Sequence, residues 1–378
     1  MPSPPPFCPN TACPNHQHPP ENKWYKPFGW YDAKAHGKVK RYACLKCGKS
    51  FSEQTFRLSY YLHLNIEFRD VFYRITACAG VRAIARYFHV TDKVITNRVG
   101  RLARQAMGTM ANLRSGFACR ESLAADGFES FIRSQYSPNN IHHLIGKTSQ
   151  YVHACDLAHM RRKGRMTEYQ KRKRERLEQG EKSLSGEIYA SFERICHTIR
   201  EMAGNVERID LHTDEKREYR AVLVAHKHMG GKIRHLTTSS RQARTFRNPL
   251  WAVNYFDREL RKDQAAHVRE TTRWSQETNN CMERLYVYAG YHNFFKPYRI
   301  KQRDTRSHAE VAGFEKKRIA SLLSTFFTRR FFFSHLRLSV SEWLVWLRGY
   351  GTPFQPGYQS LPAYVTGGER AFPMAGAA

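Results

Sequence analysis

The chain has 378 residues, of which 41% are hydrophobic and 13% aromatic, so it is long enough for about two to four domains with a sizeable core. Its formal net charge of +29 at pH 7 indicates a polyanionic partner, and nucleic acid is the leading candidate because each phosphate neutralised by Lys or Arg releases bound counterions. A membrane surface is the second explanation of the charge. However, the sequence has no lipidation motif, no secretory signal and no uncharged run of about 18 apolar residues, and we therefore expect an intracellular protein.

Four of the nine cysteines lie near the N-terminus in two close pairs. In the motif Cys44-Leu-Lys-Cys47-Gly48, two thiolates three positions apart can bind one metal ion, and the glycine allows the turn to close. The other pair has four intervening residues, which is within the spacing of known zinc sites. The predicted ligands of a structural Zn²⁺ are Cys8, Cys13, Cys44 and Cys47.

Residues 1–55 are accordingly expected to form a zinc-ribbon DNA-binding domain. An odd number of cysteines in a chain without a secretory signal argues against a disulfide framework. Two alternatives remain at this point. The two cysteine pairs could be unrelated and reduced, or His16 or His18 could replace one cysteine as a ligand.

Residues 56–118 are predicted to form a helical domain that contains a helix-turn-helix. One helix is expected from residue 80 and a second from Thr91, which is a suitable N-cap. In the second helix, four apolar side chains are expected to face inward: Val94, Ile95, Val99 and Leu102. Five polar side chains are expected to face outward and contact DNA: Lys93, Thr96, Asn97, Arg98 and Arg101. An ordinary helical hairpin with a solvated basic face is the alternative.

Residues 119–300 have the pattern of an α/β domain. Apolar runs at residues 122–132, 142–146 and 151–157 predict an antiparallel meander. A basic helical insertion is expected at about 160–205, because nine of the sixteen residues 161–176 are Lys or Arg. A further strand is expected from residue 209, with Ile209, Leu211 and Thr213 on one side, and it ends on the acidic residue Asp214. The remainder, residues 301–378, is expected to be a basic, aromatic C-terminal region with an irregular tail.

Three acidic residues stand out at strand or helix positions: Asp126, Asp214 and Glu283. Phosphodiester chemistry with two divalent metal ions requires carboxylates from separate elements that meet at one point. Mg²⁺ prefers oxygen ligands. These residue types in this arrangement therefore predict a two-metal site.

Other acidic residues compete for these roles. Asp156 and Asp210 also lie in apolar runs and are alternatives to Asp214. Glu270 is an alternative to Glu283, and the pattern from Asn280 to Glu283 is also that of a capping box.

The ordered set of motifs resembles prokaryotic insertion-sequence transposases of the DDE type. The motifs that carry the resemblance are Leu123-Ala-Ala-Asp126-Gly127, Leu211-His-Thr-Asp214 followed by Tyr219, and Asn279-Asn280-Cys-Met-Glu283-Arg284. The resemblance implies an α/β fold whose RNase H-like catalytic core, a mixed sheet flanked by helices, follows a zinc ribbon and a helix-turn-helix domain. It also implies a cytoplasmic, nucleoid-associated location.

The resemblance further implies what the protein does. Asp126, Asp214 and Glu283 would bind two Mg²⁺ or Mn²⁺ ions. The zinc ribbon and the helix-turn-helix domain would bind the terminal inverted repeats of a mobile element. The protein would cleave double-stranded DNA, transfer the strand to target DNA, and act as a homo-oligomer. Side chains expected to flank the site and contact DNA are Arg273, Trp274 and Arg284. The main alternative is a non-enzymatic, sequence-specific DNA-binding regulator with a degenerate nuclease-like core. A nuclease that hydrolyses DNA without joining strands is a third possibility.

Overall fold

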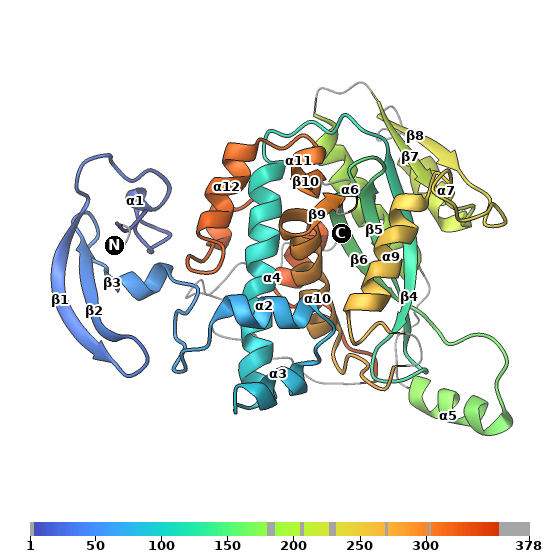
Figure 1. The fold of residues 1–378 in the computed structure, drawn as a ribbon, viewed down its shortest axis with the longest axis horizontal. Coiled ribbons are helices and arrows are strands. Elements are labelled where there is room, and N and C mark those ends of the chain that lie inside the picture. Colours follow the sequence, from blue (N-terminus) through green and yellow to red (C-terminus); the bar gives the residue numbers. More distant parts are fainter. Residues whose placement is uncertain are drawn as a thin grey trace.

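The computed structural model describes residues 4–179, 186–204, 208–226, 232–268, 271–299, 301 and 304–354. The protein is a mixed α/β molecule in which a small N-terminal sheet, a group of helices and a larger sheet follow one another along the longest axis (Figure 1). The mixed sheet flanked by helices and the cysteine-bearing N-terminal module agree with the architecture expected from the sequence.

The N-terminal module is a three-stranded antiparallel sheet, built by β1 (Tyr25–Ala33), β2 (Gly37–Cys44) and β3 (Ser50–Ser52) in that order. The short helix α1 (Pro14–Gln17) precedes it, and the 3₁₀ turn η1 (Glu53–Phe56) follows it. This module has its own small core, in which Trp24, Tyr42 and Phe51 pack beside the cysteines. It therefore has an interior of its own.

The helices of the central layer are α2 (Phe68–Thr76), α3 (Val81–Tyr87) and α4 (Asp92–Arg114). Thr91 is the N-cap residue of α4, as expected, although its side chain makes no capping hydrogen bond. The helix has 23 residues and is therefore much longer than the expected recognition helix. It continues past Leu102, the last residue expected to face inward, and its second half is buried on nearly all sides.

The larger sheet has five strands in the order β6-β5-β4-β7-β8. Strands β4 (Leu123–Phe131), β5 (Pro138–Gly146) and β6 (Val152–His159) form the expected antiparallel meander. Strand β7 (Ile209–Thr213) pairs in parallel with β4, and β8 (Ile233–Thr237) pairs in parallel with β7. The first strand of the meander therefore lies at the centre of the sheet.

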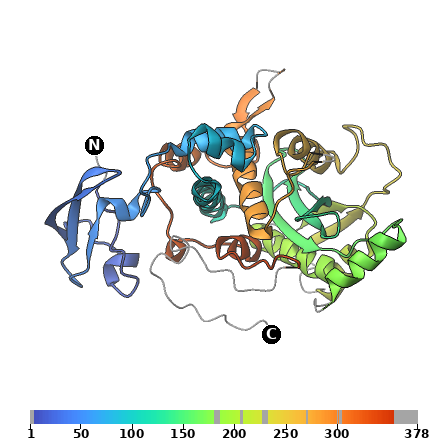
Figure 2. The ribbon, with the colours of Figure 1, turned by 90° about the horizontal axis from the view of Figure 1, so that it is seen from below.

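Helices cover both faces of this sheet (Figures 1 and 2). Helix α6 (Glu187–Ala203) packs against β5 and β6 and also against α7 (Arg217–Ala225). Helix α9 (Trp251–Asp263) packs against β4 and β5. Leu123 and Ala125 belong to the core beneath α6, whereas Ala124 and Phe128 belong to the core shared with α9. Even-numbered side chains of β4 therefore face α9, because successive side chains of a strand alternate.

The C-terminal elements complete the central layer. They are α10 (Thr278–Gly290), the π-helical turn η2 (Tyr291–Phe295), the small strands β9 (Pro297–Arg299) and β10 (Asp304–Ser307), α11 (His308–Val311), α12 (Lys316–Ser324), the 3₁₀ turn η3 (Phe333–His335) and α13 (Val340–Trp346). Helix α10 packs along α4. One hydrophobic core runs from Leu58 to Tyr350 and is continuous across the domain boundaries predicted near residues 118 and 300.

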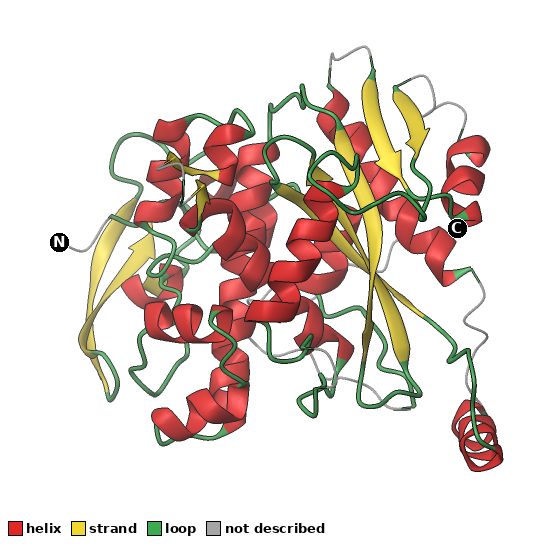
Figure 3. Ribbon diagram, turned by 45° about the vertical axis from the view of Figure 1, so that its right-hand side comes forward, coloured by secondary structure: helices red, strands yellow, loops and turns green. Residues whose placement is uncertain are grey.

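The basic insertion contains α5 (Glu168–Glu178), which projects from the body of the protein (Figures 1 and 3). None of its residues is buried.

None of the helices in the described ranges is sufficiently long and apolar to cross a membrane.

Candidate functional site

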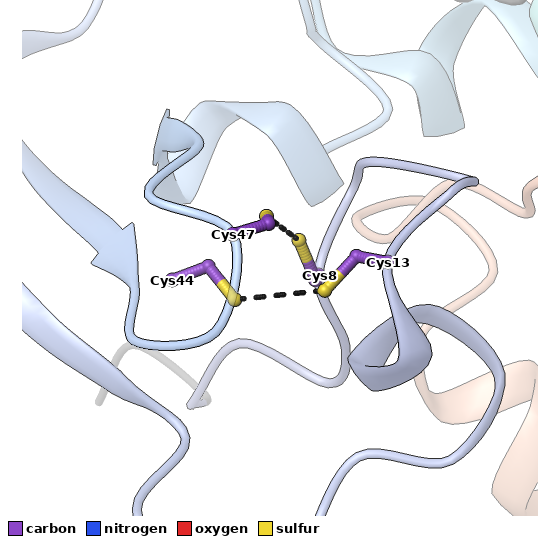
Figure 4. A group of neighbouring side chains, drawn as sticks. All are labelled: Cys8, Cys13, Cys44 and Cys47. Atoms are coloured by element: carbon purple, nitrogen blue, oxygen red, sulfur yellow. Dashed lines mark hydrogen bonds between the residues drawn. The ribbon is translucent and has the colours of Figure 1, made fainter.

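The four N-terminal cysteines lie together, as the sequence predicted. Their sulfur atoms are all within 4.8 Å of one another, and Figure 4 shows the two pairs facing each other from separate loops. The Sγ atoms of Cys8 and Cys47 are 3.6 Å apart, and those of Cys13 and Cys44 are 3.9 Å apart. A tetrahedral zinc ion with Zn–S bonds of about 2.3 Å separates its sulfurs by about 3.8 Å. The cluster therefore fits a structural metal ion such as Zn²⁺.

Neither histidine takes the place of a cysteine. His16 is buried, and both of its ring nitrogens are used: Nδ1 donates to the carbonyl oxygen of Cys8 at 2.6 Å, and Nε2 accepts from Ser334 Oγ at 2.7 Å. His18 is exposed and does not belong to the cluster. Asn15 Nδ2 lies 3.6 Å from Cys44 Sγ, where it can stabilise a thiolate.

Asp126 and Asp214 occupy neighbouring places in the larger sheet. Asp126 is in the central strand β4, and Asp214 directly follows β7, the strand that pairs with β4 in parallel. Leu123 is opposite Leu211 in this pairing, so the same register brings residues 126 and 214 level with each other. Leu123 and Leu211 both belong to the core under α6, and both carboxylates therefore point to the opposite face, the one that α9 covers.

A third carboxylate, Asp257, reaches this face from α9. Its Oδ1 atom accepts a hydrogen bond of 2.8 Å from His143 Nδ1. His143 is directly opposite Asp126 in the β4–β5 ladder, so the two side chains lie on the same face of the sheet. Neither Asp257 nor His143 was expected at this site from the sequence. The available signals were a polar residue inside a buried strand and an acidic residue in the helix that follows the last strand of the sheet.

The charges of these groups influence one another. Burial raises the pKa of Asp126 to about 6, and the negative charges of Asp214 and Asp257 act in the same direction. The backbone NH of Gly127, which donates to Asp126 Oδ1 at 2.7 Å, and the charge of Lys216 act against this shift. A carboxyl group whose pKa is raised by burial and by neighbouring carboxylates is one whose ionised form a cation would stabilise.

The three carboxylates are more widely spaced than the sulfurs of the N-terminal cluster. Among the residues that the structure describes, only the four cysteines bring three or more ligand atoms within 4.8 Å of one another. Asp126, Asp214 and Asp257 therefore share one sheet face but do not form a closed cage. In the described ranges the structure therefore supports a metal ion at the cysteines and does not give the same support for Mg²⁺ at the carboxylates.

The structure does not place Glu283 in this group. Glu283 lies in α10 and is completely buried. Its Oε1 accepts from Arg104 at 3.1 Å, and its Oε2 accepts from Arg348 at 2.8 Å. Helix α10 packs mainly along α4, which carries Arg104, and it meets the sheet at β6 and not at β4 and β7, which position the two aspartates. The capping box is not formed either, because α10 begins at Thr278 and Glu283 lies inside it.

The other candidate carboxylates are tied to arginines. Asp156 is buried and accepts two hydrogen bonds from Arg194, at 2.9 and 2.7 Å. Asp210 pairs with Arg234 on the neighbouring strand, which lowers the pKa of Asp210. These pairs leave Asp214 as the accessible acid of this strand. Glu270, the alternative to Glu283, lies outside the described residues.

Two of the five residues expected to face DNA from α4 are buried instead. Arg98 is 2% exposed and donates to the carbonyl oxygens of Val94 and Leu64, while Arg101 is 5% exposed and donates to that of Leu58. The expectation was wrong because the segment between η1 and α2 crosses over α4, and these guanidinium groups satisfy its carbonyls. Lys93 is exposed, and Thr96 and Asn97 are half-buried.

The residues expected beside the catalytic site lie next to the far end of β4. Arg273 is exposed, and Trp274 is half-buried with its ring 6.0 Å from that of Phe131. Arg284 donates to Ser275 Oγ, and burial lowers its pKa. Ser275 forms an isolated bridge with Ile132, just beyond β4. These residues therefore lie at the end of the central strand and do not contribute a metal ligand.

An open groove of about 1090 Å³ lies between the end of β4, the start of α6 and the chain that leads to α5, and Asp126, Asp214 and Asp257 are not part of its lining. Its lining includes Glu129, three residues after Asp126, and Lys216, two residues after Asp214. On its other side are the basic residues Arg161, Arg162 and Lys163, at the base of the projecting α5. Three acidic residues, Glu129, Glu178 and Glu218, also line the groove, and Arg161 pairs with Glu178. The groove therefore carries only a small positive charge.

No protein-family model matches this chain, and a search of curated proteins finds no relative.

Proposed function

We propose that the protein is a transposase of a prokaryotic insertion sequence, with an RNase H-like core that cleaves DNA and transfers the strand. The observation that carries the proposal is the placement of three carboxylates on one face of the mixed sheet: Asp126 on the central strand, Asp214 at the end of the adjacent parallel strand, and Asp257 on the covering helix. Asp257 replaces Glu283 as the third acid.

The chemistry of the three acids fits divalent metal ions. Bound Mg²⁺ or Mn²⁺ supplies activation of the attacking oxygen and neutralisation of the leaving oxygen. Asp126, Asp214 and Asp257 would hold the ions, and His143 would hold the Asp257 carboxylate in place. Lys216, whose positive charge acts on Asp126, would pair with the scissile phosphate beside the carboxylates.

The DNA-binding assignment rests on charge and on the N-terminal parts. The net charge of +29 favours a polyanion, and the exposed Lys93 with Thr96 and Asn97 would approach DNA from the start of α4. The turn between α3 and α4 is compatible with a helix-turn-helix. Together with the zinc ribbon, these elements would bind the element ends, which a homo-oligomer would hold together.

The test is cleavage of a supercoiled plasmid that carries the DNA flanking the gene, with Mg²⁺ or Mn²⁺. We expect Asp126→Asn, Asp214→Asn and Asp257→Asn each to lower the cleavage rate by about a hundredfold or more, with DNA binding retained. Asp210→Asn is the matched control on the same strand, because Asp210 pairs with Arg234 and should not affect the rate.

Two outcomes would contradict the proposal. Full cleavage by Asp257→Asn would remove Asp257 from the metal site. Absence of cleavage by the unaltered protein with either metal, together with tight specific binding, would favour a DNA-binding regulator with a degenerate core. The sequestration of Glu283 by two arginines is the observation that keeps this second function under consideration.

A further inference from the structure

The hairpin of the zinc ribbon carries large aromatic side chains on its surface. Along β1, Phe28, Trp30 and Tyr31 are 50%, 57% and 40% exposed. The core of this module is formed by other aromatic residues, among them Trp24 and Phe51, so the exposed rings are not needed to fill it. Exposed aromatic rings grouped in this way indicate a binding surface.

The exposed rings divide between the two faces of the hairpin. Trp30 is directly opposite Lys40 in the β1–β2 ladder, so these two side chains share a face, and Tyr42 follows two residues later on the same face. Tyr31 is opposite Val39 and therefore points to the other face. Trp30 and Tyr31 are therefore adjacent in sequence but lie on opposite faces of the hairpin.

The Trp30 face combines a ring with positive charge. Lys40 Nζ lies 5.6 Å from the centre of the Trp30 ring and 5.7 Å from that of Tyr42. An open groove of about 790 Å³ runs over this face, and Lys23 and Arg57 are also part of its lining. Arg57 pairs with Glu53 at 3.6 Å, whereas Lys23 and Lys40 form no ion pair with a carboxylate of the described residues. The groove therefore carries a net positive charge.

We propose that this groove binds unpaired nucleotides, with a base stacked on Trp30 and the adjoining phosphates near Lys40 and Lys23. A flat ring beside unpaired cations suits a single strand, because every base has a face to stack and every nucleotide a phosphate. A duplex offers its phosphates but keeps its bases stacked inside, so it leaves the Trp30 ring without a partner. The inference rests on the proposed function only in taking DNA as the polyanion. It specifies in addition that the zinc ribbon binds single-stranded DNA.

The experiment uses the full-length, zinc-loaded protein and a fluorescent oligothymidylate of about 12 nucleotides, a length within the site size of small strand-binding modules. A duplex of the same length is measured in parallel by fluorescence anisotropy. We expect Trp30→Ala to weaken binding of the single strand by about tenfold and to change duplex binding little. Lys40→Gln should weaken single-strand binding and reduce its dependence on salt.

Tyr31→Ala is the matched control, because it removes an exposed ring from the same strand on the opposite face. Zinc content is measured for every variant to show that the module is intact. Equal single-strand binding by Trp30→Ala and the unaltered protein would overturn the proposal. So would an equal loss in Tyr31→Ala, or a loss in Trp30→Ala that is as large for the duplex. Because binding is measured without cleavage, inactive carboxylate variants that still bind the single strand would separate this inference from the proposed activity.

Discussion

At the scale of single residues, the contact between His143 and Asp257 determines how the third carboxylate is presented. Asp257 is an acceptor, so the imidazole carries its proton on Nδ1 and donates it across 2.8 Å. His143 is fully buried in β5, and its ring packs against Phe256 of α9 at 5.0 Å. A rigid donor of this kind fixes the rotamer of the carboxylate, as the partners of metal ligands commonly do.

We therefore predict that His143→Ala weakens metal binding without weakening DNA binding. The Mg²⁺ concentration needed for half-maximal cleavage should rise by about tenfold to a hundredfold, because Asp257 loses the group that orients it. His143→Asn should restore much of this loss, since its amide Nδ2 can donate from a position close to that of imidazole Nδ1. A purely structural role would instead lower activity equally at all Mg²⁺ concentrations, and the asparagine variant would not rescue it.

At the scale of secondary-structure elements, α5 and α4 show opposite uses of basic residues. In α4, arginines are turned inward and satisfy backbone carbonyls of the segment that crosses the helix. In α5, none of the residues is buried, and the helix stands away from the body of the protein (Figure 3). Only the second arrangement leaves the positive charges available to a phosphate backbone.

We predict that Arg172→Gln combined with Arg176→Gln in α5 reduces DNA affinity and its dependence on salt. Both residues are exposed, so the fold should be unaffected. The slope of log affinity against log salt should become shallower by about 1 to 2, or 0.9 for each lost phosphate contact. Lys316→Gln with Lys317→Gln, which removes two exposed charges from α12, is the control. An equal change of slope in both double variants would show that α5 contacts the DNA no more than α12 does.

At the scale of the whole molecule, the ion pairs around Glu283 join distant parts of the chain. Arg104 comes from α4, Glu283 from α10, and Arg348 from the segment after α13. All three side chains are less than one-tenth exposed. The hydrophobic core around them is continuous, so this charged cluster links the helical layer with the C-terminal elements inside one cooperative body.

We predict that Glu283→Ala destabilises the protein by about 3–5 kcal/mol, because it removes the buried counter-ion of Arg104 and leaves Arg348 with the more exposed Glu277 alone. Urea unfolding near neutral pH, followed by circular dichroism, measures the change. Glu277→Ala is the control: Glu277 pairs with the same Arg348 but is more exposed, and its loss should cost about 1 kcal/mol or less. Unchanged stability of Glu283→Ala, together with lost cleavage, would return Glu283 to the catalytic site.

The cysteine cluster and most of the sheet strands were predictable because their signals are local. Paired cysteines at ligand spacing converge on one metal whatever surrounds them, and apolar runs identify β4 to β7 before their partners are known. The positions of Asp126 and Asp214 at a strand and a strand end could be read in the same way.

Only the tertiary structure decided which charged residues meet. Whether an acid on a helix faces the sheet depends on how that helix docks, and α9 covers the carboxylate face while α10 packs on α4. Asp257 thereby joined Asp126 and Asp214, and Glu283 became part of a buried ion-pair cluster. Arg98 turned inward for the same reason, since the chain that crosses α4 lies 34 residues away in sequence. Contacts between distant segments depend on packing, and sequence periodicity reports only which face of each element is apolar.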